Sequence, residues 1–272
     1  MELQGLGGPW TVQGLGNLIR DCHPALVFVA ETKCSANHID RLKYRFDMNG
    51  VGVDARGKNG GLAFLWAKSV DVLLQSFSQN HIDVSIRLSE EQEWWRFTKI
   101  YGEPDAGKWE LTWKLLARLQ GQSSRPWLCA GDFNELLDQS EKLGGPPRPV
   151  WQIRNFRTAL LDCGLYNLGY LGDIFTWSNK HPVPNTVLEC LDRVCGNTSW
   201  SQLFPSGFVS HIPMSCSDHK AIHIHLTSKQ KVSRGRSRPW RFEAAWLQAD
   251  QCEGVLTKGW NWVMPGANSD DF

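Results

Sequence analysis

Segments with the pattern of buried strands alternate with amphipathic helical segments along most of the chain. Residues 25–30 form an uninterrupted apolar run between helices predicted at 11–22 and 35–46. Residues 127–130 form a second apolar run, which follows a helix predicted at 105–120. Short apolar runs of this kind are typical of strands that are covered on both faces. The interleaved order therefore predicts an α/β fold in which two sheets pack face to face and helices cover them.

Further short strands are predicted in the middle and in the last third of the chain. They lie at 61–67, 70–77, 82–88, 94–101, 175–178, 187–194, 208–212 and 219–226. A fourth helix is predicted after the Gly/Pro loop at 144–149. Beyond the last strand the composition becomes basic and rich in Ser and Gly, which is typical of a linker. We therefore expect a globular domain at 1–227, a basic linker at 228–239, and an amphipathic helix with a frayed tail at 240–272.

Composition excludes several classes of protein. The formal net charge is +1, so a nucleic acid would have to be bound by a local site rather than by the field of the whole protein. The longest apolar run is far too short to span a bilayer, and residues 1–20 lack the apolar core of a secretory signal. The eight cysteines show no metal-binding or recurrent spacing. We expect reduced thiols in an intracellular monomer, nuclear or cytoplasmic, that is neither secreted nor bound to a membrane.

Acidic and polar side chains recur where predicted strands end or begin. They are Glu31, Asp132, Asn134, Asp192, Asp218 and His219. Open α/β sheets place their sites at strand ends, and carboxylates with a histidine supply ligands for Mg²⁺ and groups that activate water. Taken singly, each has an ordinary alternative, because a strand-ending Asp is commonly a turn former. His223 and His225 share the strand parity of His219, but the intervening isoleucines predict that these two histidines simply face outward.

Seven motifs occur in a fixed order along the chain. They are Gln4-Gly5-Leu6-Gly7, Ala30-Glu31-Thr32-Lys33, Ile100-Tyr101-Gly102-Glu103-Pro104, Gly131-Asp132-Phe133-Asn134-Glu135, Phe175-Thr176-Trp177-Ser178-Asn179, Leu191-Asp192-Arg193 and Ser217-Asp218-His219-Lys220-Ala221-Ile222. In order and spacing over residues 3–227 they resemble the endonuclease/exonuclease/phosphatase superfamily. Within it, they resemble the apurinic-type endonuclease domain of plant non-LTR (LINE-type) retrotransposons. Residues 240–247 resemble the segment that leads towards a reverse transcriptase, which would make this chain truncated before that enzyme.

The resemblance implies a four-layer α/β sandwich, with two packed mixed sheets flanked by helices. It also implies a divalent-metal-dependent phosphodiester hydrolase that acts as an endonuclease on DNA, whose phosphate backbone it would contact. Glu31 would ligate Mg²⁺ or Mn²⁺, with Asp218 and Glu2 as further candidate ligands. Tyr101 would support the metal and the phosphate.

The resemblance assigns the remaining roles as follows. Asp132 with Asn134 would position and deprotonate the attacking water. His219, oriented by Asp192, would stabilise the phosphate in the transition state. The residues expected at the rim of the site, in contact with the DNA backbone, are Thr176 and Ser217.

Two positions depart from the family pattern. Glu2 stands where the family has an Asn that helps to hold the metal or the phosphate, and Cys190 stands where an Arg is usual. A carboxylate at Glu2 would either ligate the metal or repel the phosphate, so the departures leave open an impaired enzyme or an inactive remnant that binds nucleic acid through its basic linker. A phosphatase of the same superfamily, acting on a lipid or inositol phosphate, is a further alternative. The retroelement-like tail and the Tyr101-Gly102 segment argue against that alternative.

Overall fold

The computed structural model describes residues 6, 8–57, 60–214 and 217–226. All of them belong to one compact unit. Glu2, the basic linker and the segment 240–272 lie outside the described residues, and what the sequence predicts of them stays a prediction. In the described part of the chain, no helix has both the length and the apolar character needed to cross a membrane.

Helices and strands alternate along the unit, as the apolar pattern predicts. The α-helices are α1 (Pro9–Cys22), α2 (Ala36–Phe46), α3 (Trp109–Gln120), α4 (Val150–Asp162) and α5 (Thr198–Leu203), with 3-10 turns at Ala106–Lys108 and Gln139–Glu141. The strands of the first half are β1 (Leu26–Ala30), β2 (Met48–Val53), β3 (Leu62–Ala67), β4 (Asp71–Phe77), β5 (His81–Arg87), β6 (Trp95–Tyr101) and β7 (Trp127–Asp132). Those of the second half are β8 (Lys142–Leu143), β9 (Tyr166–Asn167), β10 (Trp177–Ser178), β11 (Leu188–Glu189), β12 (Asp192–Gly196), β13 (Phe208–Ile212) and β14 (Ala221–His225).

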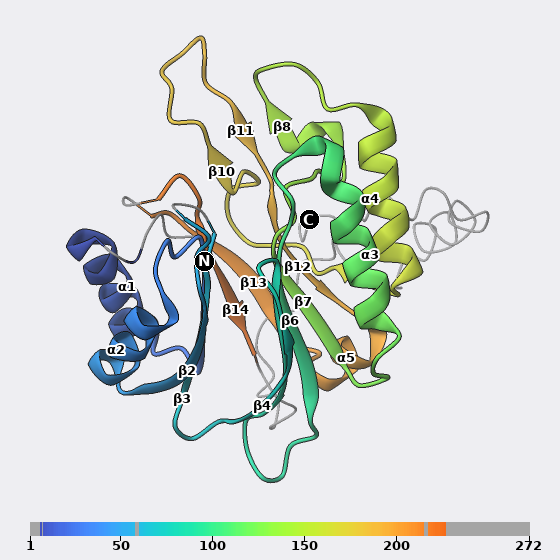
Figure 1. The fold of residues 1–272 in the computed structure, drawn as a ribbon. Coiled ribbons are helices and arrows are strands. Elements are labelled where there is room, and N and C mark those ends of the chain that lie inside the picture. Colours follow the sequence, from blue (N-terminus) through green and yellow to red (C-terminus); the bar gives the residue numbers. More distant parts are fainter. Residues whose placement is uncertain (1–5, 7, 58–59, 215–216, 227–272) are drawn as a thin grey trace, which may run out of the picture. The chain divides into compact units, whose positions relative to one another are not determined.

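The strands form one large sheet and three smaller ones. The large sheet has six strands in the order β4-β5-β6-β7-β12-β9. The smaller sheets are β1-β3-β2, β13-β14 and β10-β11-β8. Because β6 and β7 pair in parallel whereas β7 and β12 are antiparallel, the large sheet is mixed. The β1-β3-β2 and β13-β14 sheets face the large sheet, with α1 and α2 on one outer side of the unit and α3 and α4 on the other (Figure 1).

Three apolar layers hold these parts together. The central layer lies between the sheets and joins Phe28 and Phe64 to Trp95 and Leu128. A second layer packs α1 and α2 on the β1-β3-β2 sheet through residues that include Leu15, Ile39 and Leu65. A third packs α3 and α4 on the large sheet through residues that include Leu116, Phe156 and Cys129. Helix, sheet, sheet and helix thus form a four-layer α/β sandwich, which confirms the predicted fold class.

The prediction of a single strand at 187–194 is wrong, because the structure divides this segment into two strands. Its halves are β11 and β12, and the residues between them turn their backbone groups to other partners. The N–H groups of Leu191 and Asp192 donate to the hydroxyl of Thr176, and the N–H of Cys190 donates to the carbonyl of Glu141. Since this break starts β12 at Asp192, it fixes which strand residue opposes the end of β7.

Candidate active site

One cavity brings together six of the residues that the sequence singles out. It has a volume of about 360 Å³, and its walls include Glu31, Tyr101, Asp132, Asn134, Asp218 and His219. Glu31 follows the end of β1, while Tyr101 and Asp132 end the parallel strands β6 and β7 and lie opposite each other in the ladder. Residues far apart in the sequence therefore converge at one end of the sandwich.

Asp132 is held by the turn that follows it. Its side chain is buried, and its Oδ1 accepts a hydrogen bond of 2.7 Å from the backbone N–H of Asn134. Asn134 has a left-handed backbone, with φ of 56°, a conformation in which Asn is enriched among residues other than Gly. Its Nδ2 donates to the carbonyl of Gly102 at 2.9 Å, which ties the turn after β7 to the end of β6. The carboxylate and the amide are thus fixed in relation to each other.

The close approach of these two turns requires a glycine at position 102. A Cβ atom at Gly102 would lie 2.4 Å from the carbonyl oxygen of Phe133, which is closer than real Cβ contacts. The N–H of Gly102 also donates to the carbonyl of Asp132 at 2.7 Å. Any other residue would push the ends of β6 and β7 apart, and with them Tyr101 and Asp132.

Asp192 and His219 form a buried pair directly beside Asp132. Asp192 opposes Asp132 in the antiparallel β7–β12 ladder, and its Oδ2 lies 2.8 Å from His219 Nδ1. Burial of the Asp192 carboxyl by itself raises its pKa, but the charge and the hydrogen bond of His219, together with the charge of Lys99, act in the opposite direction, and the pKa is lowered. Because an ionised carboxylate can only accept, Nδ1 of His219 donates the proton, and Nε2 is the ring nitrogen turned away from Asp192.

Thr176 and Ser217, which the sequence predicts at the rim of the site, are buried in the structure. Their exposed fractions are 1% and 4%. The hydroxyl of Thr176 accepts from the backbone N–H groups of Leu191 and Asp192 at 2.9 and 3.0 Å, and that of Ser217 accepts from the N–H of His219 at 3.1 Å. Both hydroxyls accept hydrogen bonds from the backbone of Asp192 or His219, so they help to position these two residues.

Glu31 presents a carboxylate whose negative charge is supported from two sides. Tyr101 Oη donates to Glu31 Oε1 at 2.5 Å, and Lys33 Nζ lies 3.6 Å from Oε2. The backbone of Glu31 is left-handed, with φ of 48°, which turns its side chain out of the line of β1. About a third of the side chain is exposed, which leaves room for further ligands such as water.

The donor set fits a hydrated Mg²⁺ or Mn²⁺ ion better than an ion that needs a full set of protein ligands. In the described ranges, no group of three or more His, Cys, Asp or Glu side chains is arranged to hold a metal. Zinc sites use three or four protein ligands, whereas Mg²⁺ keeps several waters and needs only one or two carboxylates with substrate phosphate oxygens. Glu31 meets that smaller demand. Asp218, the second candidate among the described residues, accepts a hydrogen bond from Trp177 Nε1 at 3.1 Å on its Oδ2.

The cavity wall also includes residues to which the sequence assigns no role, although three of them lie in the ordered motifs. They are Pro104, Trp109, Arg148, Trp177, Glu189 and Leu191. Arg148 brings a cation to the wall, where its Nη2 donates to Glu189 at 3.0 Å and its guanidinium lies over the ring of Trp109 at 5.4 Å. Arg148 lies in the Gly/Pro loop that precedes α4, and no motif or periodicity marks it there. Trp109 is buried and also forms part of this wall.

The sequence of residues 10–219 matches the Endonuclease/Exonuclease/phosphatase family. The chain belongs to this family. Its members are hydrolases of phosphodiester bonds, generally use divalent metal ions, and include DNA endonucleases and phosphatases. A search of curated proteins found no match.

Solved structures share the Endonuclease/Exonuclease/phosphatase fold with this chain at low sequence identity. The endonuclease domain of TRAS1, a telomere-specific non-LTR retrotransposon, superposes with a TM-score of 0.63 at 13% identity, covering 84% of this chain and 98% of that domain. The AP endonuclease LMAP from Leishmania major gives 0.64 at 13% identity, over 82% of this chain and 85% of that one. The 3'-5' exonuclease NExo from Neisseria meningitidis gives 0.61 at 14% identity, over 83% and 98%. At these identities the likeness shows the fold alone.

Proposed function

We propose that this chain is a divalent-metal-dependent endonuclease that nicks DNA, and that it derives from a non-LTR retrotransposon of the LINE type found in plants. The ordered motifs and the similarity in fold to the TRAS1 endonuclease domain support the retroelement origin. The observation that carries the proposed chemistry is the convergence of Glu31, Asp132 and His219 on one cavity. We further propose that the protein acts inside the cell as a monomer.

In this proposal, Glu31 holds the metal, with Tyr101 and Lys33 keeping its carboxylate in place. When bound there, Mg²⁺ or Mn²⁺ supplies a Lewis acid that neutralises charge on the phosphate. Asp218 lines the same cavity and is the second carboxylate available to the metal or to its waters.

Asp132 acts as the general base. Its buried carboxylate is oriented by the N–H of Asn134, so it accepts a proton from a water held between Asp132 and the side chain of Asn134. A general base contributes about 10² to 10⁴ in rate when it lies within hydrogen-bonding reach of the proton that it takes. The close contact at Gly102 holds the end of β7, and with it the Asp132 carboxylate, in a fixed position.

His219 stabilises the phosphate oxygens as negative charge develops. Asp192 orients the imidazole through Nδ1, so a proton on Nε2 is directed away from that carboxylate. Preorganised donors of this kind avoid the cost of reorganisation during the reaction. Thr176 and Ser217 contribute by holding the backbone of Asp192 and His219, which replaces the direct DNA contact expected from the sequence.

A plasmid-nicking assay tests the proposal. Supercoiled plasmid is incubated with the full chain in Mg²⁺, in Mn²⁺, or in EDTA, and the conversion to open circles is followed. We expect nicking only with a divalent metal, and a loss of about 10²-fold or more in Asp132→Asn and His219→Ala. Asp71→Asn is the matched control, because Asp71 lies on the distant edge strand β4 and pairs there with Arg87. Its activity should equal that of the wild type.

Assays of DNA binding and of phosphate release, run beside the nicking assay, separate the alternatives. A chain that retains labelled DNA but never nicks it with any metal would be an inactive remnant. A chain that releases phosphate from a 3'-phosphorylated oligonucleotide or from an inositol phosphate, but leaves plasmid intact, would be a phosphatase. Nicking that persists in EDTA or in Asp132→Asn would contradict the roles proposed for the metal and for Asp132.

A further inference from the structure

The wall of the active-site cavity is acidic. The carboxylates that line it are those of Glu31, Asp132, Glu189 and Asp218. Among the described residues, Arg148 is the only Lys or Arg on this wall. A DNA strand brings a further negative charge with each phosphate, so a bound metal and Arg148 are the cationic groups that this wall offers to it.

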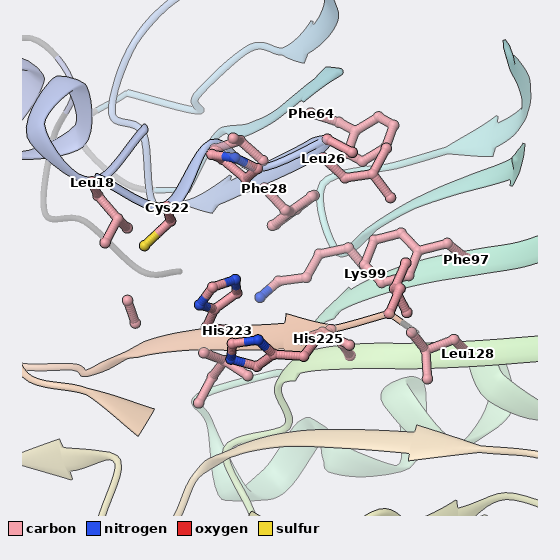
Figure 2. A pocket seen from close by; sticks show the side chains of 18 of the residues that line it. Leu18, Cys22, Leu26, Phe28, Phe64, Phe97, Lys99, Leu128, His223 and His225 are labelled. Atoms are coloured by element: carbon pink, nitrogen blue, oxygen red, sulfur yellow. The ribbon is translucent and has the colours of Figure 1, made fainter. Parts of the chain in front are cut away.

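Lys99, a buried cation elsewhere in the same domain, belongs to a different cavity. It is 3% exposed, and its Nζ lies 4.7 Å from the centre of the Phe28 ring. Its side chain extends into that second cavity between Phe28 and His223 (Figure 2). His223 and His225, which the sequence predicts to face outward, line the second cavity and are half-buried. Lys99 therefore adds no cation to the wall of the active-site cavity.

Arg148 is fixed in place by its neighbours. Its guanidinium lies over the ring of Trp109 at 5.4 Å, and its Nη2 donates to Glu189 Oε2 at 3.0 Å. Its Nε lies 3.3 Å from Glu135 Oε1, and its backbone N–H donates to Gln139 Oε1 at 3.0 Å. The side chain nevertheless remains 18% exposed. An arginine held in this way loses less conformational freedom on binding a ligand than one that moves freely at the surface.

The hydrogen-bond donors of Arg148 are only partly used. Within the described part of the chain, Nη2 has an acceptor, Nη1 has none, and Nε makes no hydrogen bond despite its approach to Glu135. Arg96 differs in each respect, because its Nε and Nη2 donate to Asp83 and its Nη1 donates to the carbonyl of Leu119. Arg96 shows what an arginine that only joins parts of this fold looks like, whereas Arg148 keeps donors for a ligand.

The positive charge of Arg148 is not cancelled by the carboxylates beside it. Glu189 has a second cation, since Lys142 Nζ pairs with its Oε1 while Arg148 holds its Oε2. Glu135 is fully buried, and burial raises the pKa of its carboxyl although the N–H of Leu136 and the charge of Arg148 act in the opposite direction. Two cations therefore face two carboxyl groups, and the cluster adds no net negative charge that would repel a phosphate.

We propose that Arg148 is a substrate-binding residue whose guanidinium, through Nη1 and the remaining N–H of Nη2, binds the non-bridging oxygens of a phosphodiester in the DNA strand that enters the cavity. This inference rests on the proposed function. The planar guanidinium matches a phosphate with two parallel N–H···O bonds, which a lysine cannot provide. The bound phosphate is the one that is hydrolysed or its neighbour along the strand, and the chemistry of the contact is the same for both.

DNA binding measured without cleavage tests the contact. A fluorescein-labelled duplex is titrated with the full chain in Ca²⁺, which takes oxygen ligands as Mg²⁺ does, and a gel checks that the duplex stays intact. Anisotropy is recorded at a series of salt concentrations. We expect Arg148→Gln to weaken binding about tenfold or more. It should also flatten the slope of log K against log salt by about 0.9, the value for one phosphate.

Arg87→Gln is the matched control. Arg87 also pairs with a carboxylate, that of Asp71, and lies over a tryptophan ring, that of Trp94 at 5.0 Å, but it is outside the cavity. It should bind DNA with the affinity and the salt slope of the wild type. An unchanged slope in Arg148→Gln, or an equal change in Arg87→Gln, would overturn the proposal.

Two further measurements separate a phosphate contact from other roles of Arg148. A phosphate contact carries no sequence information, so Arg148→Gln should weaken binding of an A·T duplex and of a G·C duplex by the same factor. A loss confined to one duplex would show a base contact and overturn the proposal. Arg148→Lys keeps the charge beside Glu135 and Glu189, and should retain the salt slope while binding several-fold more weakly. Equal losses of affinity and slope in the Lys and Gln variants would assign Arg148 to the structure of its loop instead.

Nicking kinetics in Mg²⁺ identify which phosphate is bound. A higher KM with unchanged kcat in Arg148→Gln would place the contact at a neighbouring phosphate, and a lower kcat would place it at the phosphate that is hydrolysed. Either result supports the proposal. A wild-type chain that never nicks DNA, but whose binding depends on Arg148 as described, would overturn the endonuclease function and leave this contact standing. Nicking with binding and kinetics that are indifferent to Arg148→Gln would overturn this contact alone.

Discussion

Asp192 is the buried carboxylate on which the orientation of His219 depends. The charge and the hydrogen bond of His219 lower the pKa of this carboxyl even though burial acts in the opposite direction. When the pKa of a carboxyl is lower in the folded than in the unfolded state, its ionisation stabilises the protein at pH values above the unfolded-state pKa. This stabilisation is lost as the pH falls through the folded-state pKa.

From this sign we predict how acid affects stability. The free energy of unfolding of the wild type should decrease as the pH falls below about 4. Asp192→Asn should show a shallower decrease over the same range, because that carboxyl no longer takes up a proton on unfolding. Urea titrations at a series of pH values measure both curves. Parallel curves for the two proteins would contradict the ion pair with His219.

Tyr101 donates a hydrogen bond to Glu31, and a second prediction rests on that contact. Tyr101→Phe removes the hydrogen bond to Glu31 Oε1 and leaves the ring in place. The concentration of Mg²⁺ that gives half-maximal nicking should rise several-fold, because the carboxylate loses one of its two supports, while the melting temperature changes little. Tyr44→Phe, on the exposed side of α2, serves as the control. A drop in maximal rate with no change in metal dependence would assign Tyr101 to the phosphate instead.

Cys190, which replaces the arginine usual at this position, is deeply buried, and burial raises the pKa of its thiol to about 12. A nearby arginine is present all the same, since Arg193 is buried, pairs with Glu141, and donates to the carbonyl of Cys190 at 2.8 Å. The departure at Cys190 therefore leaves a cation in this part of the fold.

The junction of β11 and β12 depends on one hydroxyl. Thr176→Val removes the acceptor for two buried N–H groups, those of Leu191 and Asp192, and each unsatisfied donor costs about 1–3 kcal/mol. We expect a loss of roughly 2–6 kcal/mol in the free energy of unfolding and reduced nicking, because Asp192 would shift. Thr176→Ser keeps the hydroxyl and should recover most of the activity. Equal damage from both substitutions would attribute the effect to packing of the methyl group.

The ends of β6 and β7 depend on Gly102 in a comparable way. Gly102→Ala places a methyl group against the carbonyl of Phe133 and should cost about 1–3 kcal/mol by overpacking. Because Tyr101 and Asp132 lie beside this contact, the nicking rate should fall by more than the loss of folded protein alone would cause. In Gly107→Ala the nearest atom is 3.4 Å away, and that variant should behave as the wild type. Urea denaturation and nicking rates, measured side by side, distinguish the two glycines.

A buried ion pair within the six-stranded sheet allows a test of stability that leaves the site untouched. Asp83 on β5 accepts from Arg96 Nε at 2.8 Å and from Nη2 at 2.9 Å, with both side chains at most 2% exposed. Asp83→Asn leaves the guanidinium buried without its charge partner, which costs about 3–5 kcal/mol.

The control for this change is a similar pair at the surface of the same sheet. Asp71→Asn breaks the exposed contact with Arg87 and should change stability by less than about 1 kcal/mol. At a temperature where both variants are folded, both should nick plasmid as fast as the wild type, since neither residue lines the cavity. A slow Asp83→Asn enzyme that is still fully folded would show that the sheet transmits strain to the site.

Much of this architecture was predictable because its signals are local. The apolar run at 25–30 and the helical stripe at 35–46 specify β1 and α2 through side-chain periodicity alone. Strand β2 escaped the same reasoning, because Gly50 and Gly52 have little strand propensity. A Cβ at Gly52 would lie 2.9 Å from Ile39 Cγ1, so packing of α2 against the strand, rather than the pattern of β2 itself, accounts for the glycine.

For the site, the sequence identified the residue types, and the ordered motifs selected Glu31, Asp132 and His219 from among many acidic and imidazole side chains. The approach of Asp132 to His219 depends on the pairing of β7 with β6 and β12, which joins segments about 30 and about 60 to 70 residues apart and which no local pattern encodes. The burial of Thr176 and the entry of Arg148 into the cavity wall are likewise consequences of packing. Periodicity specifies which face of an element is apolar. Hydrogen bonds and steric fit between distant elements decide which polar groups meet, and those contacts exist only once the chain has folded.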